Sequence, residues 1–198
     1  SIDSNNAYNY AKDVLLLAKK DNWLISRAKL IIARYQFDQG NYSKSKITFS
    51  QVLKLSSYDE GAEAKYYLSY LTFLDDSLDL AEAMIFNLID EYTNDYFVAK
   101  SFVLLSDIYV LKNNNFQAKA TLESVIENCE IDELVNIARF KWERIVEKDN
   151  IKKKDINNSS FSFIEITDED IQYTIEEYDL DYNDSIKIES DSLNTIID

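Results

Sequence analysis

One pattern occurs three times in this chain, with spacings of 36 and then 37 residues. It opens with an apolar residue followed by a small one, at Ile32-Ala33, Leu68-Ser69 and Leu105-Ser106. A triplet with helical spacing follows each opening, at Ser45/Phe49/Val52, Ala81/Ile85/Leu88 and Ala118/Leu122/Val125. Residues three and four apart share one face of an α-helix, so each copy predicts a pair of helices. Tandem helix pairs of this length are typical of a stacked α-solenoid.

The composition favours helices over strands. The chain has no Pro and only two Gly among 198 residues, whereas an all-β protein needs many turn residues. There is no His, which removes the commonest general base and metal ligand. Cys129 is the only cysteine, so an internal disulfide is excluded. No segment approaches the roughly 20 apolar residues that a membrane-spanning helix needs, so no membrane insertion is predicted.

The apolar spacing predicts eight helices. Their expected ranges are Asn5–Lys20, Trp23–Asp38, Ser43–Leu55, Ala62–Leu74, Leu80–Tyr92, Phe97–Leu111, Phe116–Asn128 and about Asp132–Lys148. The first repeats the triplet spacing at Ala11, Leu15 and Ala18, so it is interpreted as the second helix of an incomplete unit. The last has a polar outer face and is predicted to cap the stack. The small residues of the pattern are expected where helix axes cross at about 8–10 Å.

Charge divides the chain into two predicted parts. The formal charge is −15, and the segment from Asp155 onward has 13 acidic residues and one base. We therefore expect a helical repeat domain over residues 1–148 and an acidic, largely disordered tail over residues 149–198. A polyanionic tail repels nucleic acid, so no nucleic-acid partner is predicted.

The repeated segments resemble the tetratricopeptide (TPR) family. The resemblance covers about residues 7–148 and rests on Ala28…Ile32-Ala33…Gly40-Asn41-Tyr42…Ser45…Phe49…Val52 and on the segments 62–69 and 99–106. It implies an all-α solenoid of antiparallel helix pairs with a C-terminal capping helix. Residues 97–109 and 116–122 also resemble the carboxy-terminal repeats of long TPR proteins of Bacteroidota. That narrower resemblance implies a bacterial periplasmic or envelope location, with the cytoplasm left open.

The resemblance also implies where a partner binds. In TPR proteins the first helices of the units line a concave groove. The positions that match in this chain are Arg27, Arg34, Phe37, Tyr66, Tyr70, Phe73, Lys100 and Asp107. The cations suit carboxylates and the aromatic rings offer rigid contact area. We expect a non-enzymatic scaffold that binds a peptide or protein in this groove, where the chain's own acidic tail is a second candidate ligand. The alternative is a structural C-terminal segment of a longer array in a bacterial cell-envelope protein.

No cofactor, metal or catalytic site is predicted. The sequence lacks a Gly-rich phosphate loop and a Cys/His nucleophile pair. The segment 179–184 resembles the opening of a calcium loop, with oxygen-bearing residues at every second position. Asp184 replaces the glycine of the sharp turn, however, and Glu189 falls one place early for the closing acid.

Overall fold

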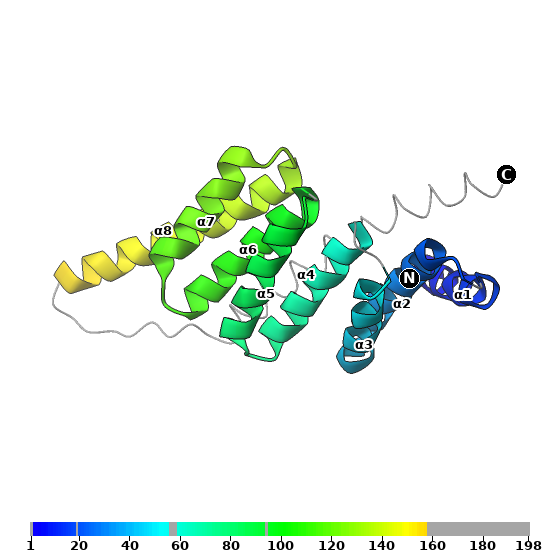
Figure 1. The fold of residues 1–198 in the computed structure, drawn as a ribbon. Coiled ribbons are helices and arrows are strands. Elements are labelled where there is room, and N and C mark those ends of the chain that lie inside the picture. Colours follow the sequence, from blue (N-terminus) through cyan, green and yellow to red (C-terminus); the bar gives the residue numbers. More distant parts are fainter. Residues whose placement is uncertain (1, 19, 56–58, 94, 158–198) are drawn as a thin grey trace.

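The computed structural model describes residues 2–18, 20–55, 59–93 and 95–157. The predicted disordered tail beyond residue 157 and its calcium-like segment lie outside these described residues. Within the described ranges, every regular element is an α-helix (Figure 1), which confirms the all-α fold class. The helices are α1 (Ile2–Leu17), α2 (Asn22–Asp38), α3 (Tyr42–Leu53), α4 (Asp59–Leu74), α5 (Leu78–Glu91), α6 (Asp95–Leu111), α7 (Asn115–Asn128) and α8 (Asp132–Asn157).

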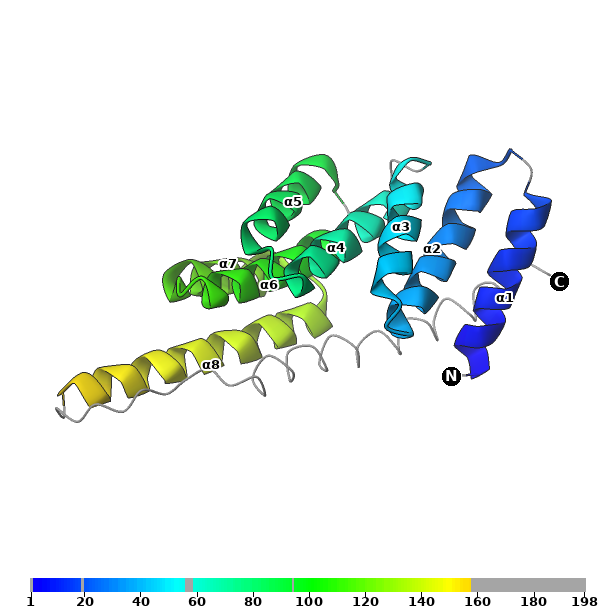
Figure 2. The same cartoon turned by 90° about the horizontal axis from the view of Figure 1, so that it is seen from below.

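The helices form antiparallel pairs that advance in a row (Figure 2). The pairs are α2/α3, α4/α5 and α6/α7, with α1 at one end of the row and α8 at the other. Each helix packs against its neighbours in sequence, and the first helices α2, α4 and α6 also contact one another in order. This arrangement is a TPR-like α-solenoid, as the repeat spacing predicted.

The last helix is longer than expected. It runs to Asn157 instead of ending near Lys148, so the predicted boundary between residues 148 and 149 falls inside α8. Asp149 explains part of the extension, because it accepts hydrogen bonds from Asn115 at 2.7 Å and from Lys119 at 2.5 Å. These contacts hold the distal part of α8 against the first turn of α7.

The same turn closes all three helix pairs. Gly40, Asp76 and Asn113 each have a positive φ, of 68°, 57° and 57°, in the left-handed region. In the first turn the Gly40 N–H donates to Phe37 O and the Asn41 N–H donates to Gln36 O, both at 2.8 Å. The other two turns repeat this pair of backbone hydrogen bonds at the equivalent residues. This is the Schellman arrangement, in which glycine, and less readily Asn or Asp, ends a helix.

The small residues of the repeat lie at helix crossings, as predicted. Ala33, Ser45, Ser69, Ala81, Ser106 and Ala118 are all at most 1% exposed. In the first pair the Ser45 hydroxyl donates to Ala33 O at 3.0 Å, which places α3 directly against α2. Large side chains at these positions would force the axes apart. The apolar members of the triplets, such as Phe49 and Ile85, fill the space between the pairs.

Candidate functional site

The structure buries most of the side chains that were predicted to line a groove. Five of the eight are almost inaccessible: Phe37 (7% exposed), Tyr66 (2%), Tyr70 (3%), Phe73 (8%) and Lys100 (6%). Arg34 and Asp107 are half-buried, and only Arg27 is classed as exposed. Contact between these residues and a partner stays a prediction, and the accessible surface that they offer is small.

The buried aromatic residues pack on one another across successive first helices. Phe37 of α2 meets Tyr70 of α4 with ring centroids 5.8 Å apart, and Tyr66 of α4 meets Phe97 of α6 at 5.9 Å. Within α4, Tyr66 and Tyr70 stack at 6.4 Å. Burial is the main cause that raises the pKa of the Tyr66 phenol well above its ordinary value. These rings therefore hold the helix pairs together.

The predicted charged residues also connect successive first helices. Arg34 of α2 donates two parallel hydrogen bonds to the carboxylate of Glu63 on α4. Farther along, Asp107 of α6 accepts from Lys141 of α8 at 3.3 Å. Lys100 lies over the ring of Tyr66, with 5.4 Å from its ammonium to the ring centroid. The first helices α2, α4 and α6, which form what we call the inner wall, are thus connected by polar contacts among their own residues and with α8.

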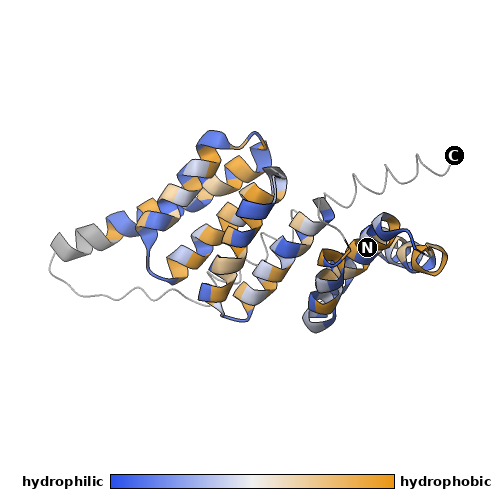
Figure 3. Ribbon diagram, viewed as in Figure 1, coloured by the Kyte–Doolittle hydropathy of each residue, from blue (hydrophilic) through white to orange (hydrophobic). Residues whose placement is uncertain are grey.

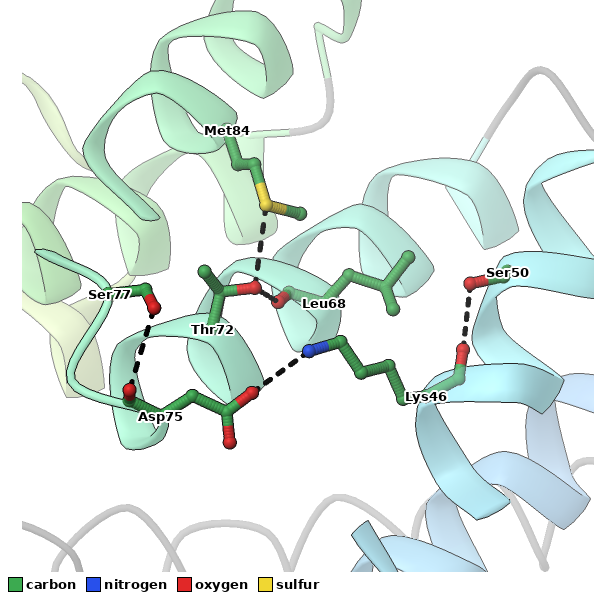
Figure 4. A network of polar contacts seen from close by, with 7 residues as sticks. All are labelled: Lys46, Ser50, Leu68, Thr72, Asp75, Ser77 and Met84. Carbon is green, nitrogen blue, oxygen red and sulfur yellow. Dashed lines mark hydrogen bonds and ion pairs between the residues drawn. The ribbon is translucent and has the colours of Figure 1, made fainter. Parts of the chain in front are cut away.

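A second row of ion pairs joins each second helix to the following first helix. Lys46 of α3 contacts Asp75 at the end of α4 at 2.9 Å (Figure 4). The equivalent positions one repeat later hold Glu82 and Lys112, 2.5 Å apart, and the next hold Lys119 and Asp149, also 2.5 Å apart. The sign of the pair reverses in the middle unit while the contact is kept. Asp149 therefore places α8 in register with the first helices of the preceding units.

Exposed apolar and basic side chains gather at the turn between α1 and α2. We call Leu16, Leu17, Lys20, Trp23 and Arg27 the N-terminal corner. Leu16, Leu17 and Trp23 are 82%, 77% and 61% exposed, and the end of α1 has apolar colouring in Figure 3. The Arg27 guanidinium lies 5.3 Å from the Trp23 ring centroid and 3.8 Å from the Glu60 carboxylate. Sequence reasoning identified only Arg27 here, although Leu16 and Leu17 fall outside the buried period of α1.

The N-terminal part of the stack is basic and the remainder is acidic. Residues 1–55, which contain α1 to α3, have nine basic and four acidic residues, a net charge of +5. Residues 56–154 have a net charge of −8. Among the described residues, no ion pair is found for the exposed Lys20, Lys44 and Lys54. The net charge of the stack therefore changes from positive at its N-terminal end to negative over the remainder.

The described residues contain no cluster of three His, Cys, Asp or Glu side chains placed to hold a metal ion. In the same part of the chain, none of the helices combines the length and the apolar character needed to cross a bilayer.

Comparisons with known proteins find similarity only among solved structures. No family model matches the chain, and no curated protein matches it. One crystal structure of MamA is 19% identical, covers 76% of this chain and 91% of its own, and has a TM-score of 0.47. A second crystal structure of MamA is 16% identical, covers 81% of this chain and 100% of its own, and has a TM-score of 0.45. The fold assignment rests on the repeated helix pairs, turns and crossings of the chain itself.

Proposed function

We propose that this chain is a non-enzymatic scaffold that binds a protein or peptide partner along the wall of first helices α2, α4 and α6. The observation that carries the proposal is the accessible end of this wall. There Trp23 is 61% exposed and the Arg27 side chain is 48% exposed. Tryptophan and arginine are the residues most often found at the energetic centres of protein interfaces.

The buried wall residues support this end instead of contacting the partner directly. Tyr70 contacts Phe37 of α2, Tyr66 contacts Phe97 of α6, and Arg34 ties α2 to α4 through Glu63. A rigid wall lowers the entropy lost on binding. Arg27 then offers charge-assisted hydrogen bonds to a carboxylate, and Trp23 offers a flat apolar face. An acidic peptide with interspersed apolar residues fits this combination.

A pair of matched variants tests the proposal. Trp23→Ser removes an exposed aromatic at the end of the wall, and Phe116→Ser removes one that is 80% exposed on the second helix α7. We expect a partner captured from the native cell by the wild type to be retained by Phe116→Ser. With the purified partner, Trp23→Ser should weaken binding by at least about tenfold. Equal binding by all three proteins would contradict the proposed wall. Tyr66 and Tyr70 are unsuitable for this test, because truncating buried rings damages the fold.

A second candidate function is a structural segment of a longer array, in which the stack itself is the function. It is favoured by α1, which buries Ala11 against Ala28 and Ile32 of α2 and is followed by the buried Ala18, with the spacing of a second helix. Tyr10 and Leu17 of the same helix are 71% and 77% exposed. The bacterial envelope location expected from the resemblance belongs to this proposal.

The mass of the native polypeptide distinguishes the two functions. A cellular protein of about 23.1 kDa would contradict the longer array. In a larger protein with further repeats before α1, Tyr10→Glu with Leu17→Glu should destabilise the whole, whereas the same changes should be nearly neutral in the present chain.

A further inference from the structure

The N-terminal corner lacks an apolar cover in the described structure. Its three apolar members are each more than half exposed, and Leu17, Lys20, Trp23 and Arg27 follow one another at intervals of three or four residues across the turn. Scattered single apolar residues are normal on a surface, but a local group bordered by charge marks an interaction site. The surrounding helices α1 to α3 are net positive. The corner is thus suited to an occupant that is both apolar and acidic.

The chain itself has a segment with this chemistry. Residues 158–198 contain twelve acidic residues and one base, Lys187. Apolar side chains are interleaved with the acids over the first half of this segment, at Phe161, Phe163, Ile164, Ile166, Ile171, Tyr173, Ile175 and Tyr178. Acidic segments that alternate with apolar residues are typical of chains that become ordered on binding.

We propose that residues 158–198 dock on the N-terminal corner of their own chain. Docking would bury Leu16, Leu17 and Trp23 under apolar side chains of the segment and place its carboxylates beside Lys20 and Arg27. It does not depend on the proposed partner. Where that partner exists, the segment competes with it for the same end of the wall.

The distal half of the segment is long enough to reach the corner. Eight helices whose axes lie about 8–10 Å apart extend over about 70 Å from first to last. Leu180, Tyr182 and Ile186 lie 23 to 29 residues beyond the end of α8 at Asn157, which corresponds to about 75–100 Å of extended chain. Because both groups belong to one chain, docking is intramolecular and has a high effective concentration.

Charge and accessibility favour the corner over the inner wall and over residues 56–154. The aromatic residues of the inner wall, Tyr66, Tyr70 and Phe73, are already buried by neighbouring side chains. Residues 56–154 have a net charge of −8 and repel an acidic segment. Charge attraction between exposed groups weakens as salt rises, since the screening length is only about 10 Å at 0.1 M. The docked population should therefore fall with salt without vanishing, because apolar burial is not screened.

Paramagnetic NMR on the full chain tests the proposal. A spin label is attached at Ser185→Cys in a Cys129→Ala background, and broadening of the backbone amide signals is followed at low salt. We expect selective broadening at residues 16–27. Lys20→Glu should lower the docked-to-free ratio by about two- to fivefold, the usual effect of one exposed charge pair. Lys44→Glu makes the same charge change at the start of α3, which follows the end of α2 that is remote from the corner, and should leave the broadening unchanged.

Three results would overturn the proposal. The first is the absence of local broadening. The second is broadening centred on the inner wall at residues 62–107, which would place the segment in the groove. The third comes from a mixture of isotope-labelled chains without a spin label and unlabelled chains with one. Broadening in that mixture would assign the docked segment to a second copy. No partner is present in these measurements, so their outcome is separate from the Trp23→Ser binding test.

Discussion

The two ends of the stack differ in how much apolar surface their outermost helices, α1 and α8, leave exposed. At the C-terminal end, α8 is in register with the first helices, and its inner stripe is buried at Leu134 (2% exposed), Ala138 (0%) and Ile145 (7%). Its outer face is mostly polar, although Phe140 and Ile151 are 41% and 39% exposed. At the N-terminal end, α1 is spaced like a second helix and packs on α2, but Leu16 and Leu17 remain 82% and 77% exposed. The apolar side chains at the N-terminal end are thus more exposed than those of α8.

A single repeat position shows how the C-terminal end is closed. Glu143 stands where the preceding first helices have Ala33, Ser69 and Ser106. A following helix could not approach α8 closely without burying this exposed carboxylate. In α8 the crossing residue is therefore changed from a small side chain to a charged one, while the rest of the packing pattern is kept.

Introducing one charge at each end should give the largest contrast. Ile145→Asp places an unpaired carboxylate in the inner stripe of α8 and should lower the free energy of unfolding by about 3–4 kcal/mol. Leu16→Asp, at a side chain that is 82% exposed in the described structure, should cost far less, no more than about 1 kcal/mol even where residues 158–198 dock on it. Urea unfolding followed by circular dichroism measures both. Equal losses would mean that Leu16 is buried in the folded stack itself.

Ion pairs between first helices should also differ from end to end. The Glu63 side chain is 5% exposed and receives two hydrogen bonds from Arg34, so Arg34→Ala should cost about 2–4 kcal/mol. At the other end, Lys141 reaches Asp107 at 3.3 Å, near the outer limit of a hydrogen bond, and Lys141→Ala should cost less.

A double variant checks the physical reason. Replacing both Arg34 and Glu63 with methionine should cost less than Arg34→Ala alone, because no buried charge is left unpaired. A larger loss of unfolding free energy in the double variant, measured by the same urea unfolding, would contradict the explanation that the unpaired buried charge causes the loss.

The same substitution to leucine can be made at the crossing position near each end of the stack. Ala33→Leu should cost about 1–3 kcal/mol, because a fully buried crossing cannot accommodate the extra atoms. Glu143→Leu makes a large side chain at the equivalent position, which is exposed in the part of the chain that the structure describes, and should be nearly neutral. Thermal unfolding of the two variants suffices. If Glu143→Leu also increases self-association in sedimentation experiments, then Glu143 prevents another helix from packing on α8. If self-association is unchanged, this role of Glu143 is not supported.

The smallest expected effect is a loss of stability at high pH that is caused by Tyr92, between α5 and α6. Burial, together with the neighbouring Glu91, raises the pKa of Tyr92 from 10.0 to about 12. The unfolded chain therefore loses this proton first, and stability that is present below pH 10 falls as the pH rises towards 12. Urea midpoints at pH 9 and pH 11 should differ less in Tyr92→Phe than in the wild type. Tyr10→Phe, at an exposed tyrosine of α1, should match the wild type.

Much of the fold was predictable from the sequence, because helix crossings demand small residues at fixed spacing. Ala33 and Ser69 mark these crossings directly. Burial of the groove positions was not predictable in the same way. Tyr66 and Tyr70 lie on a face that resemblance assigns to a partner, but the closeness of α2 and α6 to α4 decides whether that face is open. The extension of α8 past Lys148 was missed because its apolar period fades there, while the contacts of Asp149 depend on α7.

The accessible corner was missed for a related reason. Leu16 and Leu17 continue an apolar run in α1, and a run of this kind is normally assigned to the core. Only the three-dimensional arrangement separates them from the next residue, Ala18, which is 8% exposed. Trp23 lies at the start of α2, before the buried period of that helix begins.

The three identical turns have a consequence for how the chain folds. Each hairpin is closed by hydrogen bonds between residues that are near neighbours in sequence, at Gly40, Asp76 and Asn113. Proteins dominated by such short-range contacts fold quickly, since little loop-closure entropy must be lost before a contact forms. During synthesis the first hairpin can complete its turn before the later ones leave the ribosome. Each later hairpin then adds to a surface that is already in place.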